Sequence, residues 1–97
     1  MTGCFREDNI EYDAGESSNI IEQEGLTEQG CADLAAFTDE GNFWTFKAHI
    51  SEDDDTSPSG CWVKKTNEGR RRSYTGVVSG NRPCGLSGKY SSWDIFN

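Results

Sequence analysis

The sequence predicts a small α+β domain in which a single helix packs on an antiparallel sheet. Three observations predict it: a capped helical pattern after Thr27, strand patterns before and after that helix, and four widely spaced cysteines. The chain has 97 residues, of which 33% are hydrophobic. This length allows one domain with a modest core. We therefore expect disulfides to add to its stability.

The first predicted strand lies in residues 9–15, NIEYDAG. Ile10 and Tyr12 alternate with polar neighbours, and the Ala-Gly pair that follows is a turn signal. The apolar pair Ile20 and Ile21 comes next, and it suits an edge or loop segment packed on the core.

The helix is expected to begin after Thr27, whose hydroxyl suits an N-cap, with Glu28 complementing the positive end of the helix dipole. Apolar residues then recur at intervals of three and four, which predicts one buried stripe. The stripe consists of Cys31, Leu34, Ala35 and either Phe37 or Thr38. Gly41 is available for a left-handed cap at the end of the helix.

Residues 43–50 predict an aromatic strand with one apolar face. Side chains alternate between the two faces of a strand. The expected core face holds Trp44, Phe46, Ala48 and Ile50, and the expected outward face holds Phe43, Thr45, Lys47 and His49. His49 has no evident nucleophile or carboxylate partner, so we interpret it as a solvated strand residue.

Residues 60–66, GCWVKKT, predict the returning strand, with Cys61 and Val63 on one face and Trp62 and Lys64 on the other. Both Lys64 and Lys65 are expected to be solvated. Residues 67–72 are expected to form a turn that exposes three arginines, and residues 73–80 a third strand.

The loop that joins the two central strands is acidic, and its aspartates Asp53–Asp55 raise the possibility of calcium binding. Consecutive residues of an extended chain point in different directions, and the spaced oxygen ligands of an EF-hand are missing. A solvated hairpin loop is the favoured interpretation, and we expect no metal site or cofactor.

The four cysteines lie far apart, without a CxxC motif, and the chain has one histidine. Two disulfides are therefore favoured over a zinc site. Spacing alone leaves three pairings open. Cys31 on the inner face of the helix and Cys61 on a core strand are able to meet, which leaves Cys4 and Cys84 to join the ends of the domain.

Charge is unevenly distributed along the chain. Residues 1–58 carry a net charge of −13 and residues 59–97 a net charge of +5, which gives the overall −8. An acidic protein is a poor candidate for nucleic-acid binding, which requires a broad positive surface. We expect the acidic half to neutralise Arg70–Arg72, with an anionic partner as the alternative.

The order of these motifs resembles the PAN/apple domain family. The shared features are an opening cysteine, the strand NIEYDAG, a capped helix leading to a cysteine, the aromatic strand FWTF, then CWVK at 61–64 and SGNRPC at 79–84. The family usually carries a further disulfide, at positions where this chain has Ala35 and either Gly41 or Asn42. Loss of both partners together is consistent with a lost bond.

The resemblance implies a twisted antiparallel sheet that cradles one helix, and the same pairing of the four cysteines. It implies a domain over residues 4–84, followed by a tail or linker at 85–97. Family members are non-catalytic binding modules of secreted multidomain proteins, including vertebrate apple domains and microneme adhesins of apicomplexan parasites. Some of the parasite members are lectins for galactose-type sugars.

We therefore expect a non-catalytic extracellular module, secreted or at the cell surface, that adheres to host glycans of galactose type or acidic type. The alternative is a protein–protein docking module. No catalytic motif was found in the sequence, and no apolar run follows Met1, so we expect one domain of a longer secreted protein without membrane insertion. The candidate ligand-binding residues are Lys47, Trp62, Lys64, Arg71, Tyr74 and Asn81, with Tyr90 and Trp93 if the tail folds back.

Overall fold

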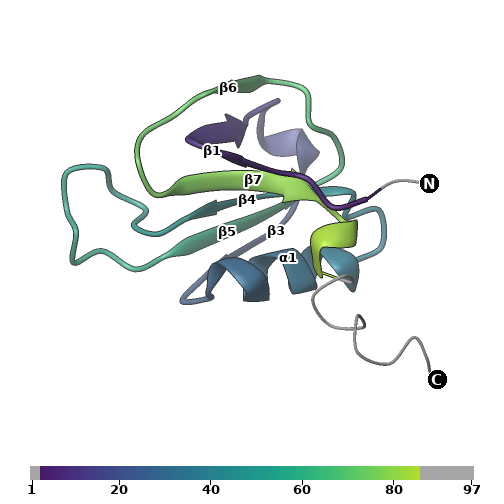
Figure 1. Cartoon of the computed structure of the whole chain (residues 1–97), viewed down its shortest axis with the longest axis horizontal. Coiled ribbons are helices and arrows are strands. Elements are labelled where there is room, and N and C mark those ends of the chain that lie inside the picture. Colours follow the sequence, from purple (N-terminus) through teal and green to yellow (C-terminus); the bar gives the residue numbers. More distant parts are fainter. Residues whose placement is uncertain (1–2, 86–97) are drawn as a thin grey trace.

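The computed structural model describes residues 3–85, in which an antiparallel sheet lies between one helix and a two-stranded ribbon (Figure 1). The small α+β class predicted from the sequence is therefore confirmed. Residues 86–97, which include Tyr90 and Trp93, lie outside the described residues.

The main sheet has five strands, all paired antiparallel. Their order is β1 (Arg6–Asp8), β7 (Val77–Asn81), β4 (Phe43–Lys47), β5 (Gly60–Lys64) and β3 (Asn19–Glu24). The ribbon pairs β2 (Ile10–Tyr12) with β6 (Arg70–Arg72). A short 3₁₀ turn, Glu16–Ser18, leads from the ribbon into β3.

The predicted strand within residues 9–15 is present as β2, and the Ile20–Ile21 pair lies in the edge strand β3. Two expectations were wrong. The aromatic strand ends at Lys47, with bends over the next residues, and Arg70–Arg72 form a strand instead of a turn. The third predicted strand accordingly begins later, at Val77.

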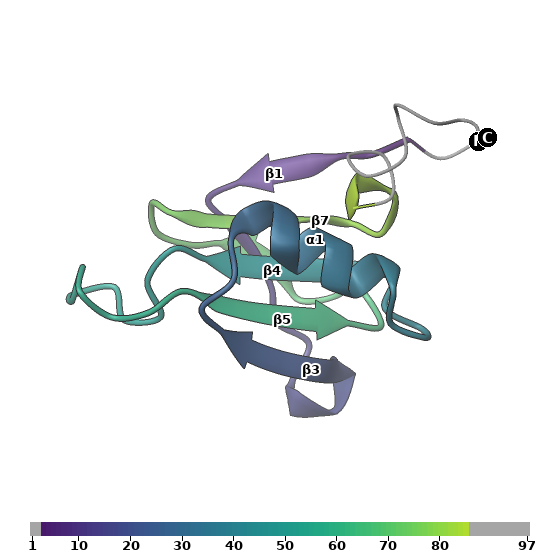
Figure 2. The same cartoon turned by 90° about the horizontal axis from the view of Figure 1, so that it is seen from below.

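The helix α1 (Glu28–Ala36) crosses one face of the sheet (Figure 2). Thr27 caps it as predicted, because its hydroxyl oxygen accepts a hydrogen bond of 3.0 Å from the amide of Gly30. Its buried residues are Cys31, Ala32, Ala35 and Ala36. Phe37 instead is 60% exposed, because the backbone leaves the helix at this residue.

Gly41 does not act as the predicted left-handed cap. The residue with positive φ is Glu40, at 63°. Gly41 is required for space, since a Cβ there would lie 2.7 Å from Val63 Cγ1 and 2.8 Å from the carbonyl oxygen of Ala35.

The core lies between α1 and the sheet, where Trp44, Phe46 and Val63 are buried. Both predicted disulfides are present: Cys31–Cys61 joins α1 to β5, and Cys4–Cys84 joins the two ends of the fold. No helix within residues 3–85 is long and apolar enough to cross a membrane.

The other face of the sheet was expected to be open to solvent, and this expectation was wrong. The ribbon covers it, so Thr45 is 2% exposed and Tyr12 is fully buried. Two side chains tie the ribbon to the sheet: Thr45 Oγ1 accepts from the Tyr12 amide at 3.1 Å, and Ser79 Oγ donates to the Ile10 carbonyl at 2.7 Å. The ribbon therefore forms a second layer on the main sheet, and it packs against polar side chains of β4 and β7.

Candidate functional site

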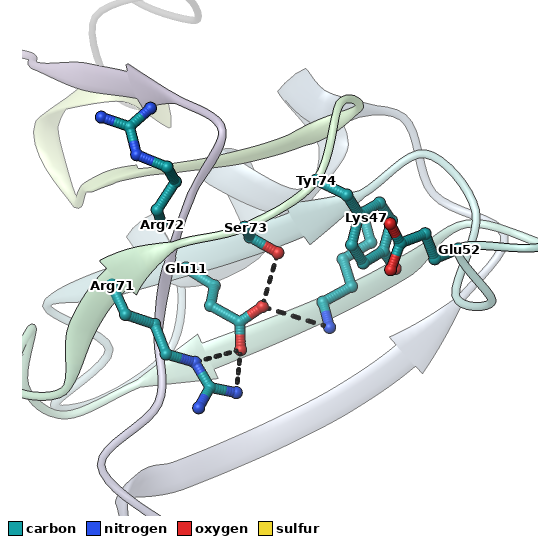
Figure 3. A pocket seen from close by; sticks show the side chains of 7 residues that line it. All are labelled: Glu11, Lys47, Glu52, Arg71, Arg72, Ser73 and Tyr74. Carbon is teal, nitrogen blue, oxygen red and sulfur yellow. Dashed lines mark hydrogen bonds and ion pairs between the residues drawn. The ribbon is translucent and has the colours of Figure 1, made fainter.

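A groove of about 580 Å³ opens between the ribbon and the sheet (Figure 3). We call it the ribbon groove. It is lined by Glu11, Lys47, Glu52, Arg71, Arg72, Ser73 and Tyr74. These side chains come from β2, β4, β6 and the segments that follow β4 and β6, so the groove depends on the non-local pairing of the ribbon.

Glu11 is the central acceptor of the groove. It is 8% exposed, and it accepts hydrogen bonds from Ser73 Oγ at 2.7 Å and from Arg71 Nη2 at 2.9 Å (Figure 3). The ammonium of Lys47 lies 3.6 Å away. Burial alone would raise the pKa of Glu11, but the bonds from Ser73 and Arg71 and the charge of Lys47 outweigh it and lower the pKa. Glu11 is therefore a fixed anion at neutral pH.

The arginines of β6 are largely neutralised by the acidic half of the chain, as expected. Arg70 pairs with Glu7, and Arg71 Nη2 lies 2.8 Å from Asp13 in addition to its bond with Glu11. Arg72 points away from Glu11 (Figure 3) and has no ion pair with any residue of the described chain. One exposed cation is thus left at the rim.

Lys47 lies between two aromatic rings. Its ammonium is 5.2 Å from the centroid of the Trp62 ring and 5.6 Å from that of the Tyr74 ring, within the range of cation–π attraction. Tyr74 is held by a hydrogen bond of 3.0 Å from its hydroxyl to the carbonyl of His49, and Trp62 donates from its indole to Glu22 at 2.6 Å. Both rings are therefore fixed in place beside the groove.

A second hollow, of about 140 Å³, adjoins the ribbon groove. Glu11 and Lys47 line both spaces. We call the smaller one the Lys64 pocket, because Lys64 lies on its floor. Lys64 was expected to be solvated, but the ribbon layer buries it to 5% exposure. This burial lowers the pKa of Lys64, although the charges of nearby carboxylates oppose the shift.

The structure brings five of the six predicted candidates together. Lys47, Arg71 and Tyr74 line the ribbon groove, and Lys47, Trp62 and Lys64 line the Lys64 pocket.

The sixth candidate, Asn81, is the last residue of β7. It pairs with Phe43 of the neighbouring strand β4, at the end of β4 that is farther from the ribbon groove. It is 3% exposed, and its amide is occupied: Oδ1 accepts from the Phe5 amide, and Nδ2 donates to the Gly3 carbonyl, both at 2.9 Å. The place of Asn81 is thus in the attachment of the N-terminal segment.

Sequence reasoning missed Glu11, Glu52 and Ser73. The carboxylates at Glu7, Glu11 and Asp13 precede and follow the Ile10–Tyr12 alternation, and this run of acids was the available signal for a partner of the arginines. No sequence signal placed Glu52 or Ser73 at a groove.

The acidic loop at Asp53–Asp55 does not arrange its carboxylates as ligands for a calcium ion. Asp54 Oδ1 accepts from the amide and the hydroxyl of Thr56, at 3.0 Å and 2.6 Å. Within residues 3–85 no group of three or more His, Cys, Asp or Glu side chains is arranged to hold a metal ion.

Comparisons of the chain with protein-family models, with curated proteins and with solved structures found no match. Inference about function therefore rests on the residues and the geometry.

Proposed function

We propose that this chain is a non-catalytic, extracellular binding module of PAN/apple type that recognises glycans in the ribbon groove. One observation carries the proposal: the fixed ring of Tyr74 lines a groove with a carboxylate at Glu11 and a guanidinium at Arg71, and the fixed ring of Trp62 lines the adjoining Lys64 pocket. Sugars stack their apolar faces on aromatic rings and exchange hydrogen bonds with planar charged groups.

The PAN/apple assignment is supported by the helix on an antiparallel sheet and by the two disulfides. A further point concerns the disulfide that family members usually add. The positions involved, Ala35 and Gly41, are neighbours here, since a Cβ on Gly41 would lie 2.8 Å from the Ala35 carbonyl oxygen. The nearness of these two positions supports the assignment, although the second position is Gly41 or Asn42 in the resemblance.

The disulfides also support an extracellular location, because such bonds persist in oxidising compartments. A binding role without catalysis is supported by the pairing of all four cysteines and by the setting of His49, which is exposed and held by a contact of 3.0 Å between Nδ1 and the Ser57 carbonyl. We place the module among further domains of a longer secreted chain.

A protein-docking function is the second candidate, and the edge strand β3 favours it. Its residues Glu22–Glu24 are exposed, and β3 pairs only with β5 in the described sheet. An unpaired strand edge offers backbone groups to another chain.

A glycan array probed with the isolated domain tests the proposal. We expect binding to galactose-terminated or acidic glycans that is lost in Trp62→Ala and Tyr74→Ala. Phe37→Ala is the matched control, because it removes an exposed aromatic ring on the helix side of the sheet. Absence of binding to every galactose-terminated, carboxylated or sulfated glycan at high protein concentration would refute the lectin function.

A further inference from the structure

The Lys64 side chain is largely buried, and its ammonium has no ion-pair partner among residues 3–85. It is 5% exposed, and its ammonium forms no hydrogen bond and no ion pair within that range. Burial of a charge is costly unless the charge is paired. The ammonium is not among the fully buried unpaired atoms of the described residues, so it keeps contact with the space of the Lys64 pocket, where a counter-charge would offset the cost of its burial.

The carboxylates near Lys64 are already engaged. Those that act on it electrostatically are Asp13, Glu11 and Glu22. Asp13 pairs with Arg71 at 2.8 Å, Glu11 with Arg71 at 2.9 Å, and Glu22 accepts the Trp62 indole at 2.6 Å. None of the three lies within 4 Å of the Lys64 ammonium.

Asn19 provides a second unsatisfied group in the same pocket. It faces Lys64 directly across β3 and β5. Its Oδ1 is buried and is the one side-chain oxygen or nitrogen of the described residues that is buried without a hydrogen-bond partner. Buried polar atoms of this kind are rare and call for an explanation. The Lys64 pocket thus combines an unpaired cation with an unpaired acceptor.

We propose that the Lys64 pocket binds the carboxylate of an acidic sugar whose ring lies in the ribbon groove. The proposal rests on the proposed glycan-binding function and names the class of sugar. One carboxylate oxygen pairs with Lys64 and the other with Lys47, whose 3.6 Å contact with Glu11 leaves donors free. The ring hydroxyl nearest the carboxylate, which is the 4-hydroxyl in galacturonate, donates to Asn19 Oδ1.

The size of the pocket fits this assignment. Its 140 Å³ corresponds to the space of about five water molecules at roughly 30 Å³ each. That volume admits a carboxylate with an adjoining hydroxyl but not a whole sugar ring. The ring remains in the ribbon groove, where Tyr74 and Lys47 form the wall.

The test compares D-galacturonate, D-galactose and D-galactose 6-sulfate by NMR titration of the whole chain. We expect the wild type to bind galacturonate at least about ten-fold more tightly than galactose, as one charge-assisted hydrogen bond provides. In Lys64→Met the preference for galacturonate over galactose falls to within about two-fold. Lys65→Met, which removes the adjacent exposed lysine, keeps the preference.

The result that overturns the proposal is a Lys64→Met variant that still prefers galacturonate. Equal affinity of the wild type for galacturonate and for D-galactose 6-sulfate also overturns it, because the pocket would then bind any oxyanion and not a carboxylate in particular. Should Lys64→Met fail to fold, the wild-type amide shifts decide: galacturonate, and not galactose, must move the amides of Lys64 and Asn19.

Failure of the glycan function is separable from failure of the pocket. A wild type that binds neither sugar refutes the proposed function, and acetate then serves as the probe. Saturable acetate shifts at Lys64 and Asn19 that are retained in Lys65→Met support a carboxylate site, and their absence overturns it.

Discussion

Removal of the charge of Glu11 tests most directly how much the ion pairs and hydrogen bonds of the ribbon groove stabilise the fold. The substitution Glu11→Gln keeps the shape and one of the two acceptor oxygens, but it replaces the other oxygen by an NH2 donor and removes the charge that Ser73 and Arg71 bind. A hydrogen bond to a charged group contributes about 1.5–3 kcal/mol, against about 0.5–1.5 kcal/mol for a neutral pair. Weakening of one bond and loss of the acceptor of the other therefore cost about 2 kcal/mol in total, since Arg71 is 61% exposed and solvent replaces part of its contact.

The stabilisation lost in Glu11→Gln depends on pH, and it is greatest where Glu11 is ionised. The folded state lowers the pKa of Glu11 below its ordinary value of 4.5. The stabilisation is therefore fully present above the unfolded pKa, and it is lost as pH falls through the folded pKa. The difference in free energy of unfolding between wild type and Glu11→Gln should shrink steadily from pH 6 to pH 3.

Urea denaturation of both proteins at several pH values measures this difference. Glu68→Gln is the matched control, since it removes a charge from an exposed turn and should change stability by less than about 0.5 kcal/mol. A Glu11→Gln variant as stable as Glu68→Gln at pH 7, or a difference that does not change with pH, would refute the reasoning.

Three further substitutions test the fold. Replacing Cys4 and Cys84 by alanine opens a loop with a sequence separation of 80 and should lower the free energy of unfolding by about 4.5 kcal/mol in urea; a loss under about 1 kcal/mol would contradict the bond. Gly69→Ala should cost about 1–3 kcal/mol more than Gly25→Ala by thermal unfolding, because both residues have positive φ but only Gly69 would place a Cβ 2.2 Å from a backbone oxygen; equal losses would argue against that contact. Thr27→Ala should cost about 1 kcal/mol through the lost cap, with Thr27→Ser close to wild type; an unchanged midpoint for Thr27→Ala would exclude the cap.

Local signals in the sequence were sufficient to predict the side of the sheet that α1 covers. The cap at Thr27, the apolar face of residues 43–47 and the meeting of Cys31 with Cys61 each depend on periodicity within a single element or on one helix–sheet contact. The helix stripe was misplaced at its end, because the last apolar residue, Phe37, leaves the helical path.

The ribbon could not be predicted in the same way. It pairs Ile10–Tyr12 with Arg70–Arg72, some sixty residues apart, and three consecutive arginines carry no alternation that marks a strand. Charge complementarity predicted the neighbours of the arginines but not their geometry. Lys64 and Lys47 were therefore expected to be solvated, although the ribbon lies over them.

Most of the candidate site was nevertheless present in the sequence reasoning. Lys47, Trp62 and Tyr74 were singled out as planar or cationic groups of the basic half and its partner strand, and the fold brings them together. The acceptors Glu11 and Asn19 were missed, because an acidic or amide residue in a polar segment has no local pattern that separates a groove residue from a solvated one.

Mapping of sugar contacts by NMR tests the central claim, that the ribbon groove is the ligand site, most directly. On titration with D-galactose or D-galacturonate, the indole NH of Trp62 and the amides of Glu11 and Ser73 should shift and saturate together. The indole of Trp44, buried on the helix side and bonded to the Asn81 carbonyl at 3.0 Å, should not move. Saturable shifts confined to β3 or to the acidic loop, with Trp62 and Glu11 unchanged, would contradict it.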